Sequence, residues 1–328
     1  MICLLGGSGF IGTRLARRLR NEDVDFYIAD KSQSGTYPEL SSVVDVRAVD
    51  DLRRVLKEGD ILINLAAEHR DDVRPRSLYD EVNVKGAENL CVVAREKNIQ
   101  HIIFTSSVAV YGFAPANTGE NGEINYFNDY GRTKWEAEKV FRAWQQEEPE
   151  KRTLVVVRPT VVFGEQNRGN VFNLLRQIAS GKFLMIGKGI NKKSMAYVEN
   201  VAAFLEHSLK FPPGIHTYNY IDKPDFDMNT LVGVVRQALG KSGGIATRIP
   251  YGVGYLMGLG CDLVANITGK SLPISSIRVK KFCATTQFNT AISQTGFVPP
   301  VSLEDGLKRT VTHEFLEDHS KKPVFYTE

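Results

Sequence analysis

The fold of this chain is decided by its first twelve residues, Met1-Ile2-Cys3-Leu4-Leu5-Gly6-Gly7-Ser8-Gly9-Phe10-Ile11-Gly12. The first five residues are a short apolar run, which predicts a buried strand. A glycine-rich turn follows at once, and the pattern from Thr13 to Leu19 predicts a helix. A strand, a glycine turn and a helix in this order are typical of a site that holds the diphosphate of a dinucleotide at the helix N-terminus.

Three glycines of this turn have separate expected roles. Gly6 permits the tight turn, Gly9 lets the backbone approach a pyrophosphate, and Gly12 lets the helix pack closely against the strand. Their spacing is three and three, whereas the usual dinucleotide fingerprint has two and three. The expected cofactor contacts in this turn come from Gly6, Ser8, Gly9, Phe10, Ile11 and Gly12.

An acidic residue follows the second expected strand, which covers residues 24–29. This residue, Asp30, is in the position expected to bind the two hydroxyl groups of a ribose. A carboxylate there repels a 2′-phosphate, so NAD is favoured over NADP as the cofactor. Lys31, beside it, weakens that preference and is itself an expected cofactor contact.

The bulk composition is that of an ordinary globular chain. Of its 328 residues, 42% are hydrophobic and 24% charged, which allows one large domain or two unequal ones. A net charge of +3 is too small to argue for nucleic-acid binding. The four cysteines lack the spacing of a disulfide framework or a zinc site, so no metal is expected and a cytoplasmic location fits best. Neither a signal peptide nor a membrane-spanning helix is expected.

The first half of the chain alternates apolar strands with helices. Strands are expected at 43–46, 60–67, 101–107 and 152–158, and helices at 50–57, 78–97 and 136–146. Continuous apolar strands separated by helices indicate an α/β fold with a parallel sheet covered on both faces. The regular alternation ends at Pro159. We therefore expect a dinucleotide-binding domain at 1–165, completed by a segment near 195–222, and a smaller α/β substrate-binding domain at 166–328.

Three polar side chains are expected at the carboxyl edge of this sheet, where ligands bind in open parallel sheets. Ser107 ends a strand, while Tyr130 and Lys134 begin the next helix, four residues apart and so on one face. Beside a nicotinamide they form a hydride-transfer site. Tyr130 exchanges the proton of a substrate alcohol, Lys134 lowers the pKa of that phenol and holds the nicotinamide ribose, and Ser107 holds the substrate oxygen. A strand-end serine pair and a solvated helix are the alternative.

With these motifs in place, the chain resembles the extended short-chain dehydrogenase/reductases of the nucleotide-sugar epimerase/dehydratase type. The matching elements also include Arg158-Pro159, residues 197–201 and Gly296-Phe297. The resemblance implies a Rossmann-like doubly wound sheet, NAD, and a homodimer that pairs the helices around 83–98 and 130–146. It also implies cofactor contacts from Asp45, Val46, Leu65, Ala66, Ala67, Asn83, Tyr130, Lys134 and Pro159.

Four segments, 66–73, 169–175, 193–197 and 278–288, resemble a narrower bacterial branch. Its members interconvert N-acetylglucosamine and N-acetylgalactosamine at C4 while the sugar is carried on undecaprenyl diphosphate, for surface polysaccharide (O-antigen) biosynthesis. Common UDP-sugar epimerases differ at two places, since many have Lys at the position of His69 and Arg at that of Lys193. The resemblance implies substrate contacts from His69, Arg70, Ser107, Asn170, Lys193 and Arg278.

The segment 249–265 is apolar and carries one charge, and Arg278, Lys280 and Lys281 follow it. An apolar segment beside cations suits an anionic membrane surface. We therefore expect residues 249–267 to dock on the inner face of the bacterial cytoplasmic membrane and to admit the lipid diphosphate. A buried helix with solvated lysines is the alternative.

The predicted reaction is C4 epimerisation through a transient 4-keto sugar, with NAD regenerated in each cycle. Three rival functions remain open. A UDP-N-acetylglucosamine 4-epimerase shares every catalytic residue, and an NAD(P)H-dependent 4-keto-sugar reductase shares them but consumes reductant. A non-catalytic NAD-sensing module has no need of Ser107, Tyr130 or Lys134, and all three are present.

Overall fold

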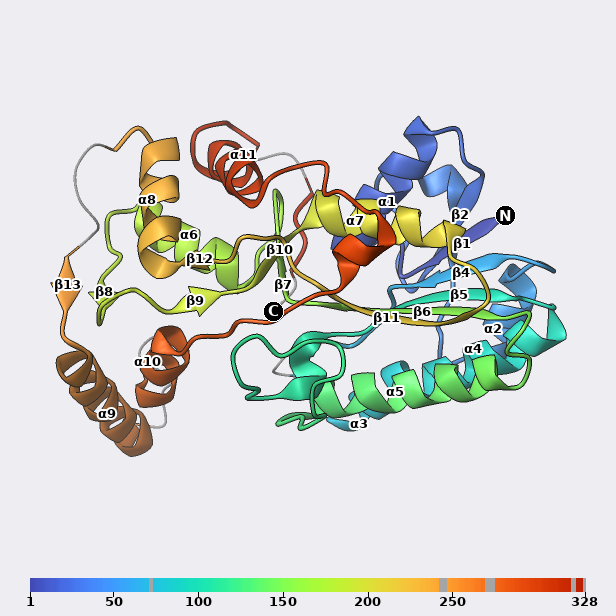
Figure 1. The fold of residues 1–328 in the computed structure, drawn as a ribbon, viewed down its shortest axis with the longest axis horizontal. Helices are drawn as coiled ribbons and strands as arrows, with labels where there is room; N and C mark the ends of the chain where they lie inside the picture. The colour runs from blue at the N-terminus through green and yellow to red at the C-terminus, as the bar shows by residue number, and fades with distance from the viewer. Residues whose placement is uncertain (71–72, 242–246, 269–274, 320–322, 327–328) are drawn as a thin grey trace.

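The computed structural model describes residues 1–70, 73–241, 247–268, 275–319 and 323–326 (Figure 1). Its larger part is a seven-stranded parallel sheet in the order 11-6-5-4-1-2-3. The chain starts in the middle of this sheet and winds outward in both directions, which confirms the Rossmann-like doubly wound fold. The strands are β1 (Ile2–Leu5), β2 (Phe26–Asp30), β3 (Ser41–Val43), β4 (Ile61–Asn64), β5 (His101–Thr105), β6 (Thr153–Pro159) and β11 (Gly214–Tyr220).

Helices cover both faces of the sheet (Figure 1). On one face lie α1 (Phe10–Asn21) and α7 (Val198–His207), and on the other lie α2 (Val49–Val55), α4 (Gly86–Glu96) and α5 (Asp129–Gln146). Each face has its own apolar core, because the central strands are buried on both sides. In one of these cores, Phe141 and Trp144 of α5 are fully buried and Phe141 packs on Phe104 of β5.

The outermost strand beside β6 comes from a much later part of the sequence. Strand β11 pairs with β6 in register over seven residues, from Gly214 opposite Thr153 to Tyr220 opposite Pro159. It lies within the segment near 195–222 that the sequence assigns to the dinucleotide-binding domain. The division of the chain at residues 165 and 166 stays a prediction.

Several element boundaries differ from the sequence expectation: β3 lies at Ser41–Val43 and not at 43–46, and β4 and β5 end before residues 67 and 107. Two helical boundaries differ for local reasons. Helix α5 begins at Asp129, so it includes Tyr130 and Lys134 as well as the expected helical segment 136–146, and the side chain of Asn128 caps it by accepting a hydrogen bond from the Gly131 amide at 2.9 Å. The expected single helix at 78–97 is α3 (Ser77–Tyr79), a π turn at Asp80–Lys85 and α4, joined without a break in helical backbone. A π turn inserts one extra residue into a helix and often marks a functional site.

The remaining residues form a second region of helices and short strand pairs around a separate apolar core. The strand pairs are β7 with β10, β9 with β12 and β8 with β13. Their bounds are β7 (Val161–Phe163), β8 (Met185–Ile186), β9 (Lys192–Lys193), β10 (Met195–Tyr197), β12 (Phe226–Asp227) and β13 (Arg248–Ile249). The helices are α6 (Asn170–Ala179), α8 (Met228–Ala238), α9 (Tyr251–Thr268), α10 (Ser276–Cys283) and α11 (Leu303–Phe315).

Helix α9 lies at the end of the molecule farthest from the sheet (Figure 1). Its Leu256 and Leu263 side chains are 68% and 61% exposed, so α9 is not the buried helix that the sequence left open as an alternative. Among the described residues, no helix combines the length and apolar character needed to cross a bilayer. Asp71 and Asp72, which belong to the 66–73 resemblance, lie outside the described residues.

Candidate active site

A cavity of about 990 Å³ runs along the carboxyl edge of the sheet, where the chain leaves strands β1, β2, β4, β5 and β6. This volume is at the upper end of the range for small-molecule sites. Most of the residues expected to bind cofactor or substrate line it. They are Gly6, Ser8, Gly9, Phe10, Ile11, Gly12, Asp30, Lys31, Asp45, Val46, Leu65, Ala66, Ala67, His69, Arg70, Ser107, Tyr130, Lys134 and Pro159.

The glycine turn between β1 and α1 has the geometry that a dinucleotide diphosphate needs. Gly6 has a φ of +78°, and a Cβ there would lie 2.6 Å from the Ala66 amide nitrogen. A Cβ on Gly12 would lie 2.5 Å from the Cα of Gly7, so only glycine lets α1 pack this closely. Gly9 caps α1 without a side-chain hydrogen bond, which leaves the first turn of the helix available to an anion.

The acidic residue at the end of β2 lies beside this turn. The Oδ2 atom of Asp30 accepts a hydrogen bond from the Ser8 amide at 3.0 Å, and Oδ1 accepts one from the Ser32 amide at 3.0 Å. A carboxylate has about four acceptor positions. The remaining ones can accept from a pair of ribose hydroxyl groups, so Asp30 fits the role that the sequence assigns to it.

A second carboxylate lies at the same end of the cavity. Arg47 lies 2.6 Å from Asp45 through Nη2 and Oδ2 and also pairs with Glu81 at 3.5 Å. The hydrogen bonds from Arg47 hold the pKa of Asp45 below its usual range, so this carboxylate stays charged. Arg47 lines the cavity next to Val46 and was not singled out from the sequence.

Tyr130 and Lys134 lie on one face of α5, with the Lys134 Nζ 6.0 Å from the centre of the Tyr130 ring. The Lys134 side chain is buried and donates a hydrogen bond to the carbonyl oxygen of Thr105 at 2.7 Å. It also lies 4.9 Å from the centre of the Phe104 ring. Burial lowers the pKa of Lys134 to about 7, against the opposing effect of Glu138.

Ser107 lines the same cavity from the loop after β5. It caps the short 3₁₀ helix η3 (Val108–Tyr111), and its Oγ accepts a hydrogen bond from the Ala109 amide at 3.1 Å. A hydroxyl that accepts in this way still has its own proton to donate. The structure therefore brings Ser107, Tyr130 and Lys134 to one cavity, while their catalytic roles stay predictions.

A buried ion pair between Arg158 and Glu138 joins strand β6 to helix α5 next to Lys134. One turn after Lys134, Glu138 accepts from Arg158 of β6 at 2.6 and 2.8 Å and from the Ser106 hydroxyl at 2.6 Å. Both charged side chains are almost fully buried. Glu138 was not singled out from the sequence, although its spacing of four residues from Lys134 places it on the same helix face.

Asn83 does not line the cavity, but it bonds to Glu68, which does, and to Thr133 of α5. Its amide nitrogen donates to the Thr133 hydroxyl at 2.9 Å and to the Glu68 carbonyl at 3.0 Å, and its Oδ1 accepts from the Glu68 amide at 2.8 Å. These bonds join the π turn, α5 and the chain after β4. Asn83 thus contacts the elements that carry the expected cofactor residues.

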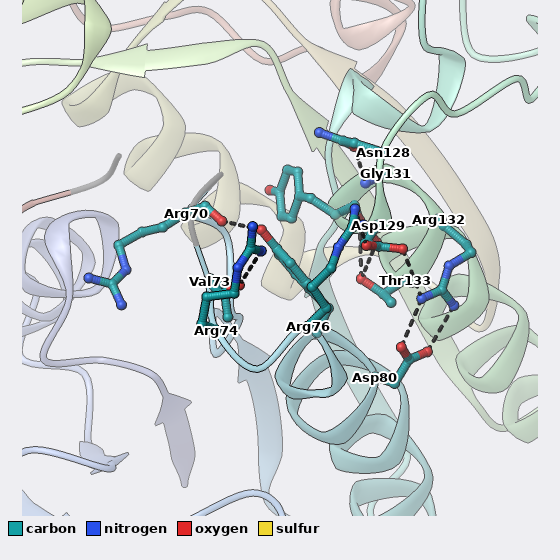
Figure 2. Close-up of polar contacts among 12 residues, drawn as sticks. Arg70, Val73, Arg74, Arg76, Asp80, Asn128, Asp129, Gly131, Arg132 and Thr133 are labelled. Carbon is teal, nitrogen blue, oxygen red and sulfur yellow. Dashed lines mark hydrogen bonds and ion pairs between the residues drawn. The ribbon is translucent and has the colours of Figure 1, made fainter. Parts of the chain in front are cut away.

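Ion pairs hold the start of α5 against the preceding helical segment (Figure 2). Arg132 donates to both carboxylate oxygens of Asp80 at 2.8 Å, and Arg76 pairs with Asp129 at 2.7 Å. The Thr133 hydroxyl donates back to the Asp129 carbonyl at 2.8 Å. Tyr130 lies between these anchored residues in the sequence, so the helix turn that carries it is held from both sides.

His69 and Arg70 enter the cavity from the chain after β4. Burial lowers the pKa of His69 below its usual value, so its ring is neutral at pH 7 and offers a hydrogen bond, not a charge, to a phosphate. The Tyr79 hydroxyl bonds to the Arg70 carbonyl, while the Arg70 side chain is half exposed and extends away from the start of α5 (Figure 2).

Three residues expected at the substrate do not line this cavity. Asn170 is exposed at the start of α6, and Arg278 is exposed on α10. The Lys193 Nζ donates to the carbonyl oxygens of Lys281 and Ala284 at 3.0 and 2.7 Å and to the hydroxyl of Thr286 at 3.2 Å. Burial lowers its pKa to about 8. Lys193 thus contacts Thr286, which does line the cavity.

Several lining residues were missed by the sequence analysis. Thr286 and Phe288 lie in the 278–288 segment that resembles the bacterial branch, and that segment was a usable signal. Tyr326 belongs to none of the quoted motifs. The other missed lining residues are Ala29, Ser32, Val44, Arg47, Glu68, Leu78, Val82, Thr105, Ser106, Val108, Ala109, Gly112, Thr160, Val161 and Val162. In the part of the chain described by the structure, no cluster of three or more His, Cys, Asp or Glu residues could hold a metal ion.

Solved structures of low sequence identity share this fold. A UDP-N-acetylglucosamine 4-epimerase from Bacillus cereus has a TM-score of 0.75 at 16% identity, covering 94% of this chain and 97% of that one. A Thermus thermophilus UDP-glucose 4-epimerase in complex with NAD has a TM-score of 0.71 at 18% identity, covering 95% and 98%.

Sequence relatives are closer. An Escherichia coli O157:H7 protein, N-acetyl-alpha-D-glucosaminyl-diphospho-ditrans,octacis-undecaprenol 4-epimerase, is 50% identical over 98% of this chain and 96% of its own length. A Vibrio cholerae UDP-glucose 4-epimerase is 27% identical over 98% and 97%. The model of the NAD dependent epimerase/dehydratase family matches residues 2–219. The chain therefore belongs to the NAD dependent epimerase/dehydratase family, and NAD is its cofactor.

Proposed function

We propose that this enzyme is an isomerase that interconverts N-acetylglucosamine and N-acetylgalactosamine, carried on undecaprenyl diphosphate, by epimerisation at C4. One observation carries most of this proposal, the 50% identity over nearly the whole chain to the E. coli relative with that substrate in its name. The presence of Ser107, Tyr130 and Lys134 around one cavity agrees with it.

The residues around the cavity supply the proton chemistry of this reaction. NAD, when bound, supplies a reversible acceptor for the hydride at C4. Tyr130, as phenolate, accepts the proton of the C4 hydroxyl and later returns a proton to the same oxygen. Ser107 donates a hydrogen bond to that oxygen while it is a carbonyl, and the protonated Lys134 favours the phenolate of Tyr130.

The diphosphate of the substrate needs cations near the sugar. Arg70 lines the cavity and is half exposed, so its guanidinium can make charge-assisted bonds to phosphate oxygens. Lys193 and Arg278 remain proposed phosphate contacts; all three N–H donors of Lys193 are in use, so it would exchange its bond to the cavity residue Thr286 for one to a phosphate oxygen. His69, being neutral, is proposed to hydrogen-bond the substrate without adding charge.

A lipid carrier requires access from a membrane, and α9 supplies a suitable surface. Gly254 and Gly258 lie on its inner side, where an added Cβ would come 2.7 Å from Ile186 and 2.7 Å from Ser276. The opposite side carries Leu256, Leu259 and Leu263, which are 68%, 43% and 61% exposed. Helix α10, which packs against the inner side of α9 at Gly258, carries the exposed Lys280 and Lys281. We propose that α9 lies on the anionic inner face of the cytoplasmic membrane.

Two further parts of the proposal concern assembly and pathway. A homodimer that pairs α4 and α5 with their copies is proposed on the family resemblance, and the 39% exposed Val92 on α4 agrees with it. A lipid-linked N-acetylgalactosamine suits the first sugar of a surface polysaccharide. We therefore propose a role in the biosynthesis of O-antigen, the polysaccharide of lipopolysaccharide.

The carrier is tested by giving the purified enzyme two substrates in parallel. GlcNAc-diphospho-undecaprenol in detergent micelles and UDP-GlcNAc are incubated separately, and the released sugars are separated to detect the C4 epimer. The proposal predicts N-acetylgalactosamine from the lipid-linked substrate and at least a hundredfold less from UDP-GlcNAc, about 2.7 kcal/mol in discrimination. Equal or faster turnover of UDP-GlcNAc would support the UDP-sugar epimerase instead.

A further inference from the structure

The last described residues of the chain, 323–326, lie against the glycine turn although nearly the whole sequence separates the two. The Phe325 ring lies 5.9 Å from the Phe10 ring, measured between centroids. The next residue, Tyr326, lines the same cavity as the glycine turn and the candidate catalytic residues. We name residues 323–326 the strap.

Backbone hydrogen bonds hold the strap in place. The Phe325 amide donates to the Gln166 carbonyl at 2.8 Å, and the Arg168 amide donates to the Phe325 carbonyl at 2.7 Å. The amide and the carbonyl of Phe325 therefore both bond to the loop after β7. These backbone bonds do not depend on the side chain at position 325.

The loop that anchors the strap is itself fixed to α11. Glu314 of that helix accepts from the Gln166 amide at 2.6 Å and pairs with the Arg168 guanidinium at 2.8 Å. Both anchoring residues thus share one buried carboxylate. Through Glu314, helix α11 therefore fixes the loop that holds the strap.

Phe10 connects the strap to the cofactor. It is the first residue of α1, and Gly9 before it caps the helix without a side-chain bond. Phe10 is 6% exposed, and its ring centre lies 5.9 Å from that of Phe325 and 5.5 Å from the guanidinium carbon of Arg14. Removal of the Phe325 ring would uncover Phe10 and loosen the helix end that receives the dinucleotide diphosphate.

We propose that the strap retains NAD between turnovers. Phe325 is a positioning residue that holds Phe10 and the first turn of α1, and Tyr326 forms part of the cavity wall over the bound cofactor. Retention suits a reaction that regenerates its cofactor in each cycle. The inference itself requires only that NAD binds at the glycine turn, and does not depend on which sugar is the substrate.

The rate of cofactor release tests this proposal. The purified protein is loaded with NADH and chased with excess NAD⁺, and the fluorescence of bound NADH is followed in time. We expect Phe325→Ala to release NADH about tenfold faster than the unaltered protein, equivalent to about 1.4 kcal/mol, and Tyr326→Ala about threefold faster. Phe325→Tyr keeps the ring and should restore release to within about twofold of the unaltered rate.

Leu316→Ala is the matched control, because Leu316 is 56% exposed just after α11 and does not line the cavity. It should leave the release rate unchanged, and all variants should keep their melting temperatures within a few degrees. If Phe325→Ala fails to fold, Tyr326→Ala decides the question. Release rates of Phe325→Ala and Tyr326→Ala that match the unaltered protein, or an equal acceleration in Leu316→Ala, would overturn the proposal.

Discussion

At the scale of single residues, the phenol of Tyr130 is the proposed proton acceptor and donor of the reaction. Replacing Tyr130 by Phe removes the only oxygen of that side chain and keeps its packing. General acid–base groups contribute about 10²–10⁴ in rate, so Tyr130→Phe should lower kcat by that factor while NADH still binds. Epimer formation and NADH fluorescence measure the two properties separately.

Tyr126→Phe is the matched control for this experiment, because Tyr126 is 38% exposed and does not line the cavity. Its turnover should equal that of the unaltered enzyme. Residual epimerisation by Tyr130→Phe within about tenfold of the unaltered rate, below the range expected of a general base, would remove Tyr130 from the proposed mechanism.

Lys134 gives a prediction about stability and pH. Burial lowers its pKa to about 7 in the folded protein, whereas the unfolded chain keeps the ordinary lysine value near 10.4. Between these values the unfolded state binds more protons, so stability rises with pH from about 7 to about 10. Lys134→Met removes this penalty and should stabilise the cofactor-free protein by a few kcal/mol at pH 7 and by much less at pH 10.

Urea unfolding at the two pH values measures this difference. Lys139→Met, an exposed change on the same helix, should have a small effect that does not depend on pH. A stability gain of Lys134→Met that is the same at pH 7 and pH 10 would show that the lysine is not held with a lowered pKa.

The expected site residues that line the cavity are mostly those whose position follows from local pattern. The glycine turn, Asp30 and the Tyr130–Lys134 pair each come directly after a strand or begin a helix, so the sheet order brings them together. Lys193 and Arg278 were expected at the substrate but do not line the cavity. Their places depend on how short strands and helices of the second region pack, and no local pattern encodes that.

At the scale of elements, the buried pair of Arg158 and Glu138 joins β6 to α5 below the site. Breaking a buried ion pair by removing one partner costs on the order of 3–5 kcal/mol, and here Glu138 would be left with the longer pair with Arg142 at 3.6 Å. Arg158→Leu should therefore lower the free energy of unfolding by about that amount in a urea titration. Arg95→Met breaks an exposed pair with Glu147 and should cost far less. Equal losses in the two variants would contradict the account.

Helix α9 carries the prediction about the membrane. Liposomes with anionic lipid should bind the protein in a flotation experiment, because burial of exposed leucines in the interface is favourable. Leu256→Asp combined with Leu263→Asp places two carboxylates on the exposed face and should reduce binding at least tenfold, since each charge opposes insertion and the anionic surface.

Val298→Asp is the control for the α9 variant, because Val298 is 79% exposed and lies outside α9. It should bind liposomes like the unaltered protein. Equal flotation of the α9 variant, with unchanged turnover of the lipid-linked substrate, would rule out α9 as the membrane contact.

The elements of the first half could be predicted because apolar strands and amphipathic helices alternate there without interruption. The boundaries were less certain where a side chain outside the pattern decides them, as Asn128 does for α5. The exposure of α9 was left open by the sequence. An apolar segment is the same in composition whether it is buried or docks on a lipid surface, and only the folded structure distinguishes the two.

At the scale of the whole molecule, the sheet strands and the loops that follow them line most of one large cavity, and distant later segments add three residues to it. Strand β11, Thr286, Phe288 and Tyr326 all come from beyond residue 210, yet they complete the sheet or line the cavity. The fold class follows from the first half of the sequence. The lining by Thr286, Phe288 and Tyr326 depends on contacts between distant parts of the chain. This division explains why the reaction type was easier to infer than the carrier.

Reductant-free turnover of GlcNAc-diphospho-undecaprenol that carries deuterium at C4 is the decisive test of the proposed epimerisation. We expect N-acetylgalactosamine in large molar excess over enzyme, without added NADH, and with the deuterium still at C4 by mass spectrometry. Product formation only when a reductant is added, or a C4 epimer that has lost its deuterium to solvent, would contradict it.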